Sequence, residues 1–331
     1  PIYISGNATK GAYVAGGAAY NNNVSYNSVS MTGTNLTGRN VIGGVSLMLE
    51  GDDRFGAYSA DNNKVTISGG VINFYSFTPP GAPSSERLGG HVYGGYTKFA
   101  KGSASNNTVI IQDGATVRDS VVGGFTDQRL TEEDVKTKGV LDTKANGNYV
   151  LVKDSTVNGQ VSGAQGAATA NDNTIIIDNS TVGYVVGAAE GVGIEDGGSS
   201  VVNKNNNTVI IRNNSVVNMW AAAVYDYSVN AQGNTLTLDN STVNMASVYA
   251  VNMGWASDSS GENPVKATVA NNTLNLNNMS GTFDELGGSI NLAGTSNGNI
   301  INITNSDVTL TNTSGYFFTN KLDLPKLAAN E

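Results

Sequence analysis

Asn-Thr-Val-Ile-Ile-Gln-Asp at residues 107–113 begins the stretch of sequence that decides the fold. It is followed by Ala-Thr-Val at 115–117 and by Ser-Val-Val-Gly-Gly at 120–124. Short runs rich in β-branched residues, which favour strands, are therefore separated by residues that favour turns. A second copy begins with Asn-Thr-Ile-Ile-Ile-Asp at Asn173 and continues in the same way. Each copy predicts a unit of three short strands joined by tight turns.

The opening phrase of this stretch, Asn-x-apolar-x-apolar, recurs along the chain, and we assign nine copies to successive units. Its leading residues are Asn27, Asn63, Asn107, Asn148, Asn173, Asn207, Asn234, Asn272 and Asn299. A three-stranded unit of this size cannot bury its apolar residues alone, so neighbouring units must stack on one another. The repeat therefore predicts an all-β fold: a parallel β-helix in which three sheets of about nine to ten coils surround a narrow core.

The composition agrees with this prediction and argues against several other classes of protein. The chain of 331 residues contains 44 Asn and 41 Gly, and only 14% of its residues are charged, against about 25% in typical globular proteins. A net charge of -9 argues against a nucleic-acid partner. The absence of Cys excludes disulfides and thiolate metal sites. No apolar run approaches the ~20 residues that a membrane-spanning helix needs.

Alternation within the first strand predicts which side chains point inward. In Leu236-Thr237-Leu238 the two leucines face the core and the threonine faces outward, because side chains alternate along a strand. The same period of two turns the leading Asn inward, where its amide group can continue a ladder of hydrogen bonds along the stack. We therefore assign the leading Asn residues a structural role.

Most variation in repeat length falls after the third strand, so loop inserts are expected on one edge of the stack. Two long inserts are expected, at roughly residues 74–88 and 126–146, and Thr131–Lys136 in the second has the pattern of a short helix start. We expect a single solenoid over residues 1–315, as a mature fragment of a longer protein. Residues 316–331 leave the repeat and are expected to form a C-terminal cap or a linker.

Units of this type, including His-Val-Tyr-Gly-Gly-Tyr at 91–96 followed by 106–117, resemble the passenger domains of type V autotransporter adhesins of Gram-negative bacteria, and most of all those of fusobacteria. The resemblance covers about residues 1–315. It implies a right-handed β-helix that is displayed outside the outer membrane and tethered by a C-terminal β-barrel that this sequence does not include. It is specific for fold and export route and does not identify a ligand.

A catalytic alternative rests on three residues. Some β-helix enzymes cleave polysaccharides with paired aspartates and a histidine, and this chain has Asp52, Asp53 and a single histidine, His91. The other segments of the polygalacturonase family are missing, so we interpret these residues as parts of loops. The pairs Asp52–Asp53 and Glu195–Asp196 offer too few oxygens for Ca²⁺, which takes about 6 to 8. We therefore expect no enzymatic activity, no cofactor and no metal site.

Two predicted surface features could bind a partner. The outward middle residue of the first strand is aliphatic in four adjacent coils, at Ile110, Leu151, Ile176 and Ile210. This stripe is either covered by the 126–146 insert or used for a partner or self-association. The second feature is a cluster of aromatic and Met residues, whose candidate binding members are Trp220, Tyr225, Tyr227, Tyr249 and Trp255. These aromatics either bind a sugar or protein surface or pack as a satellite core.

The patterns predict a non-catalytic rod, and the resemblance implies that it is extracellular, on the bacterial surface, and binds host or bacterial surface glycans or proteins. Self-association is a further option for partners, whereas nucleic acid and direct membrane insertion are not expected. The first alternative is a passive structural stalk. The second is a polysaccharide-degrading β-helix enzyme. An exposed aromatic patch would favour the adhesin over the stalk, and a cleft with two carboxylates would favour the enzyme.

Overall fold

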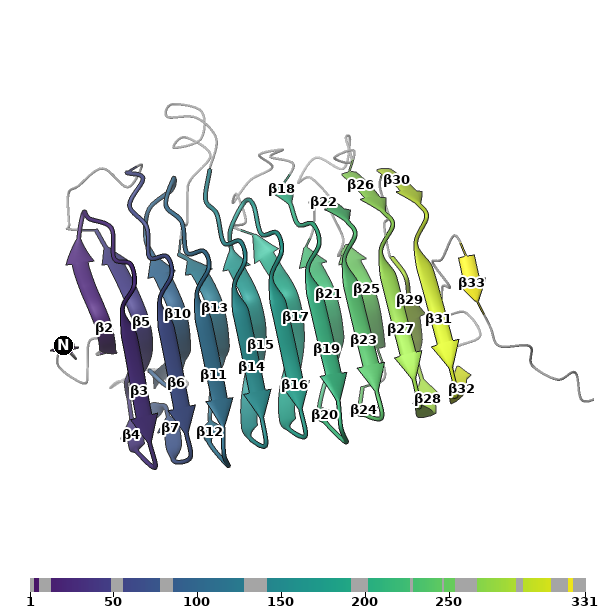
Figure 1. Cartoon of the computed structure of the whole chain (residues 1–331), viewed down its shortest axis with the longest axis horizontal. Helices are drawn as coiled ribbons and strands as arrows, with labels where there is room; N and C mark the ends of the chain where they lie inside the picture. The colour runs from purple at the N-terminus through teal and green to yellow at the C-terminus, as the bar shows by residue number, and fades with distance from the viewer. Residues whose placement is uncertain are drawn as a thin grey trace, which may run out of the picture.

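The computed structural model describes residues 3–5, 13–48, 56–77, 86–127, 142–191, 202–226, 229–245, 247–253, 267–289, 294–310 and 321–323. Regular structure in these ranges consists of β-strands, which confirms the all-β prediction. Equivalent strands of successive repeats lie side by side, in chain order, along the long axis of the molecule (Figure 1). Within the same ranges, no helix is long and apolar enough to cross a membrane. The helix expected at 131–136 lies outside the described residues.

The first strand of each of the nine repeats joins a parallel sheet that we call the front sheet. One further strand, β33 (Lys321–Asp323), extends this sheet although it lies in the segment expected to be a cap or linker. Its strands pair without offset, so that Ile110 lies beside Leu151 and Leu151 beside Ile176. In order they are β3 (Ser28–Thr32), β6 (Lys64–Ser68), β11 (Thr108–Gln112), β14 (Tyr149–Lys153), β16 (Thr174–Asp178), β19 (Thr208–Arg212), β23 (Thr235–Asp239), β27 (Thr273–Asn277), β31 (Ile300–Thr304) and β33 (Lys321–Asp323).

Most of the expected second strands and all of the described third strands form one sheet, the back sheet, rather than two. In β15 and β17 the second strand runs directly into the third, and a register shift between Val157 and Gln160 takes the place of a turn. Such an irregularity bends a strand without ending it. The members are β1 (Tyr3–Ser5), β2 (Tyr13–Tyr20), β4 (Asn35–Thr37), β5 (Asn40–Leu47), β7 (Val71–Asn73), β10 (Val92–Thr97), β12 (Thr116–Val117), β13 (Val121–Thr126), β15 (Thr156–Gly166), β17 (Thr181–Gly191), β20 (Val216–Val217), β21 (Ala221–Asp226), β24 (Thr242–Val243), β25 (Ser247–Met253) and β29 (Glu285–Gly287).

Three smaller sheets complete the described part of the chain. A parallel sheet on the return to the next repeat contains β18 (Val202–Asn203), β22 (Val229–Gln232), β26 (Ala267–Ala270) and β30 (Gly294–Asn297). The pair β28 (Ser280–Phe283) and β32 (Asp307–Leu310) is parallel, and the pair β8 (Tyr75–Phe77) and β9 (Glu86–Leu88) is antiparallel. The last pair corrects one prediction. The insert near 74–88 follows β7 and precedes β10, so it lies between second and third strands and not on the return edge.

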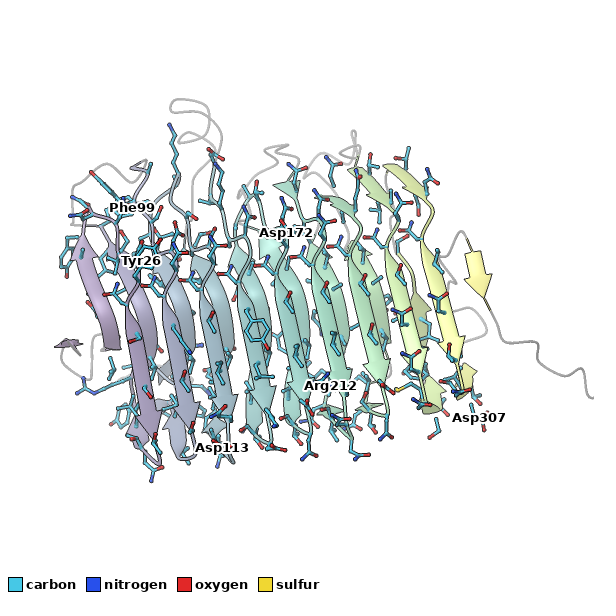
Figure 2. The ribbon with its side chains drawn as sticks, viewed as in Figure 1. Tyr26, Phe99, Asp113, Asp172, Arg212 and Asp307 are labelled. Carbon is cyan, nitrogen blue, oxygen red and sulfur yellow. The ribbon has the colours of Figure 1, made fainter. Side chains whose placement is uncertain are left out.

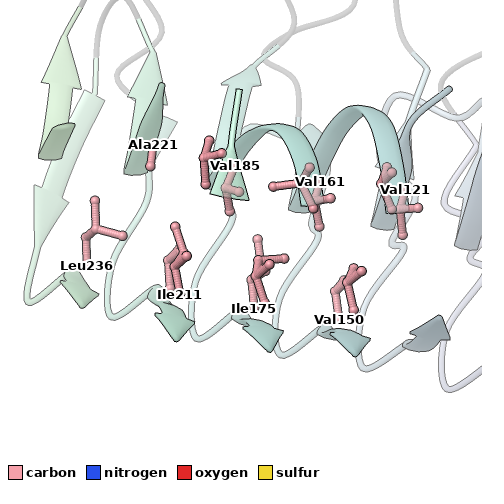
Figure 3. Close-up of a cluster of buried hydrophobic side chains, with 14 of the residues drawn as sticks. Val121, Val150, Val161, Ile175, Val185, Ile211, Ala221 and Leu236 are labelled. Carbon is pink, nitrogen blue, oxygen red and sulfur yellow. The ribbon is translucent and has the colours of Figure 1, made fainter. Parts of the chain in front are cut away.

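The core lies between the front and back sheets. Figure 3 shows side chains of the two sheets pointing toward each other, and those it labels are 0% exposed: Val121, Val150, Val161, Ile175, Val185, Ile211, Ala221 and Leu236. Burying a Val, Leu or Ile side chain contributes roughly 1.5–3 kcal/mol. A second, smaller core of Ala and Val residues lies toward the return strands and includes Ala170, Val224 and Ala231. The arrangement is consistent with the solenoid that the repeat predicts.

The predicted Asn ladder is present. The backbone N and the side-chain Nδ2 of Asn173 both donate to Oδ1 of Asn207, at 3.1 and 2.9 Å. The same pair of bonds links each leading Asn to the next one, from Asn27 through to Asn299. From Asn63 onward these residues are at most 1% exposed. The ladder therefore satisfies a buried polar group in every repeat, as a stable interior requires.

The residue before each leading Asn explains the Asn-Asn and Gly-Asn dipeptides. It has a positive φ in every case, as at Tyr26 (61°), Asp172 (58°) and Gly298 (63°). Asn, Asp and Gly adopt this conformation most readily, and it turns the chain into the front sheet. A second row of such residues, including Asp113, follows the front strands. Figure 2 places Tyr26 and Asp172 toward one edge of the sheet and Asp113 at the opposite edge.

Candidate binding face

The outer surface of the front sheet carries the predicted stripe. Ile110, Leu151, Ile176 and Ile210 are paired in one row across four strands, and each is partly exposed. The row becomes polar toward the C-terminus, where Asn275 and Asn302 hydrogen bond to each other at 2.9 Å. The predicted position of the stripe is confirmed. Residues 128–141 of the insert expected to cover it lie outside the described residues, so its covering stays a prediction.

The outer surface of the back sheet carries an aromatic group. Val185 and Ala221 point into the core, so the residues before them face outward: Tyr184 on β17 and Trp220 directly before the neighbouring strand β21. The Trp220 ring stacks on Tyr184 with centroids 5.1 Å apart and contacts Tyr225 at 4.9 Å. All three are partly exposed. The Tyr184 hydroxyl donates to Gln160 Oε1 at 3.3 Å, and burial raises the pKa of this tyrosine.

Two exposed methionines lie close to this aromatic group along the chain and the stack. Met219 and Met245 occupy neighbouring repeats, joined by a backbone hydrogen bond of 3.2 Å, and are 39% and 53% exposed. Met219 directly precedes Trp220. We call the surface formed by Tyr184, Met219, Trp220, Tyr225 and Met245 the aromatic patch. Large exposed apolar side chains in one place are a common feature of interaction sites.

The other predicted binding residues are placed differently. Tyr249 lies on the neighbouring strand β25, is only 4% exposed and donates its hydroxyl hydrogen to Glu285. It therefore supports the surface rather than presenting a ring to a ligand. Tyr227 and Trp255 lie outside the described residues. Of the two tryptophans in the chain, Trp220 is the one that can be assigned to the patch.

A second aromatic group lies on the same outer surface, nearer the N-terminus. Tyr93, Tyr96 and Phe125 contact one another with centroids 5.3–5.5 Å apart. Tyr96 donates to Asp127 Oδ2 at 2.5 Å. Burial raises the pKa values of Tyr93 and Tyr96 far above the ordinary value for tyrosine, and the Asp127 carboxylate raises them further. Tyr93 is 9% exposed, so this group is packed more tightly than the aromatic patch.

His91 stands beside this second group. Its Nδ1 is 3.5 Å from Asp119 Oδ1, and its ring stacks on Tyr93 with centroids 5.7 Å apart. Burial lowers the pKa of His91, and the Asp119 carboxylate opposes that shift. Asp52, Asp53, Glu195 and Asp196 lie outside the described residues, so the predictions about them stay predictions. Within the described ranges, no group of three or more His, Asp or Glu residues is arranged to hold a metal ion.

Two features escaped the sequence analysis. Tyr184 was not assigned to the aromatic cluster, although it stands directly before Val-Val-Gly, as Trp220 stands before Ala-Ala-Ala. An alignment of the repeats on these three residues places Tyr184 and Trp220 at the same position of neighbouring repeats. Lys204, which is fully buried and paired with Asp226, was also missed. The sequence indicates this residue by its position, because Lys204 stands three residues before a leading Asn, where the neighbouring repeats have Ala170 and Ala231.

Comparison with known proteins does not assign the chain to a family. No family profile matches the chain, and no curated protein matches it. The case for a function therefore rests on the repeat and on the surfaces described above.

Proposed function

We propose that this protein is a non-catalytic adhesin rod, displayed outside the cell, that binds surface glycans or proteins through the aromatic patch. The stacking of Trp220 against Tyr184 and Tyr225, with Met219 and Met245 exposed beside it, is the observation that carries the proposal. Aromatic rings offer flat apolar faces for sugar rings and serve as anchors in protein interfaces. Rings held in place by their neighbours lose little entropy when a ligand binds.

The architecture proposed for the rod is a right-handed parallel β-helix. Its support is the stacking of successive parallel strands in chain order in both main sheets, together with the continuous Asn ladder. Parallel strands in one sheet are almost always joined by right-handed crossovers. Such a rod would hold the aromatic patch on a stiff lateral surface. Display on the bacterial surface is what the resemblance to autotransporter passengers implies.

Binding of the purified protein to an array of host and bacterial surface glycans, and to whole cells, tests the proposal. Trp220→Ala should weaken binding by about 2 kcal/mol or more, roughly thirtyfold. Tyr20→Ala is a matched control, because Tyr20 is a 55% exposed aromatic residue on the same sheet, at the end of β2. Circular dichroism melts of both variants would separate loss of binding from loss of fold.

The possible outcomes distinguish the alternatives. Loss of binding in Trp220→Ala alone supports the adhesin and locates its site. Equal binding by both variants and the parent protein removes the aromatic patch from the site. No binding by the parent protein to any glycan or cell favours the passive stalk. Release of sugars from a polysaccharide substrate would favour the enzyme, for which His91 beside Asp119 is the one described catalytic candidate.

A further inference from the structure

A buried lysine interrupts the second core. Lys204 is 0% exposed and lies three residues before the leading Asn207. The equivalent residues of the neighbouring repeats are Ala170 and Ala231, which are buried in the small Ala and Val core. A fully buried lysine is rare unless it is paired, because removing its charge from water is costly.

The Lys204 amino group has two partners. Its Nζ contacts a carboxylate oxygen of Asp226, the last residue of β21, and donates to the backbone carbonyl of Ala189. The side chains of Lys204 and Asp226 are 0% and 8% exposed. Both charged groups are therefore held in contact in a place from which water is nearly excluded. A buried ion pair of this kind often fails to recover the cost of desolvating its charges.

We propose that Lys204 and Asp226 condense to form an intramolecular isopeptide bond. A proton passes from the Lys204 ammonium to the Asp226 carboxylate, which gives a neutral amine and a carboxylic acid. The amine nitrogen then attacks Asp226 Cγ, and the C–N bond forms as the C–OH bond breaks. A second proton from nitrogen leaves with the hydroxyl group as water. The reaction changes no oxidation state and needs no further reactant.

The surroundings favour this reaction. Two groups held in contact react as though each were present at an effective concentration of up to about 10⁵–10⁸ M. Condensation also replaces two buried charges with a neutral amide, which removes the cost of burying them. The remaining N–H stays within reach of the Ala189 carbonyl, so the new amide keeps a hydrogen-bond partner.

The bond would close one whole repeat into a covalent ring. Lys204 precedes the leading Asn207 and front strand β19, and Asp226 ends the back strand β21 of the same repeat. A cross-link that closes such a loop stabilises the fold by restricting the unfolded chain. The chain has no Cys, so no disulfide could serve this purpose. The inference is independent of the proposed binding function.

Mass spectrometry of the full chain tests the proposal directly. The parent protein, folded and then denatured, should be lighter than its sequence by the mass of one water molecule. Trypsin should fail to cleave after Lys204 but should still cleave after Arg212, which lies between the two residues. The peptide containing Lys204 should therefore remain joined to the one containing Asp226. Lys204→Met should have the mass of its sequence.

The exposed pair Lys144–Asp142, with 3.4 Å between Nζ and Oδ1, is an internal control in the same digest and should stay unlinked. An intact mass equal to that of the sequence would overturn the proposal. So would a loss of water that maps to any other pair of residues, including an aspartyl succinimide. Because the parent protein alone decides the question, the result does not depend on whether Lys204→Met folds.

Discussion

Replacing Asn173 with Asp tests whether the ladder holds the repeats together, because it changes chemistry without changing shape. In the parent protein Oδ1 of Asn173 accepts two hydrogen bonds of 3.0 Å from Asn148, and Nδ2 donates to Oδ1 of Asn207 at 2.9 Å. Aspartate keeps the acceptor and replaces the donor with a carboxylate oxygen. That oxygen would face Oδ1 of Asn207 in a site that is 0% exposed.

The expected cost has two parts. Loss of a buried hydrogen-bond partner destabilises by about 1–3 kcal/mol, and burying an unpaired carboxylate adds to this. Burial raises the pKa of a carboxyl group above its unfolded value of about 3.9. Stability of the variant is therefore greatest below that value and falls as pH rises through the folded pKa. In acid the protonated carboxyl group can donate to Asn207 again, so the difference from the parent should shrink.

Asn158→Asp is the matched control, since it changes net charge equally and Asn158 is exposed on β15. Thermal melts followed by circular dichroism at pH 7 and near pH 4 provide the measurement. At pH 7 Asn173→Asp should melt several degrees below Asn158→Asp, since 1 kcal/mol corresponds to about 2–4 °C in domains of 150–250 residues. Equal melting temperatures at pH 7 would refute the ladder as a source of stability. If the two melting temperatures differ by the same amount near pH 4 as at pH 7, the electrostatic explanation is refuted.

Three further predictions concern packing and charge. Gly124→Ala should severely lower the melting temperature or the soluble yield, because its Cβ would lie 1.9 Å from a backbone carbonyl oxygen; an unchanged melt would contradict this. In urea titrations, Ile177→Ala should lower the free energy of unfolding by about 2–5 kcal/mol, because Ile177 is buried in the core. Ile176→Ala, on the outward row, should lower it much less, and equal losses would contradict the assignment of the two faces. Burial raises the pKa of Asp178, but hydrogen bonds from Asn213 and Arg212 outweigh it and lower the pKa overall. The stability this group contributes is therefore present above about pH 3.9 and lost as pH falls through the lower folded pKa, and an NMR titration should show that pKa rising in Arg212→Met.

The sequence predicted the features that repeat in every unit. A leading Asn at the same place in nine units must be satisfied by its neighbours in the stack, so its inward position followed from periodicity alone. The outward row through Ile110 and Ile176 followed from the period of two within a strand. Both predictions depend on local geometry that is the same in every repeat.

The features that were missed are not repeated in every unit. The merging of second and third strands in β15 and β17 reflects a bend, and a bend has no fixed residue signature of the kind that a turn has. The insert at 74–88 was predicted on the return edge, where most variation in repeat length falls, but its strands β8 and β9 lie between β7 and β10. Lys204 follows β18 and Asp226 ends β21, and no spacing rule predicts the contact between them.

The state of Trp220 on ligand binding tests the central claim most directly. The chain has two tryptophans, so Trp255→Phe leaves Trp220 as the sole source of indole fluorescence. Acrylamide quenching of this variant can be measured with and without the glycan or receptor that the binding screen identifies. If the aromatic patch is the binding site, saturating ligand should shift the Trp220 emission and protect it from quenching. Saturating binding with no change in either property would place the binding site elsewhere on the rod.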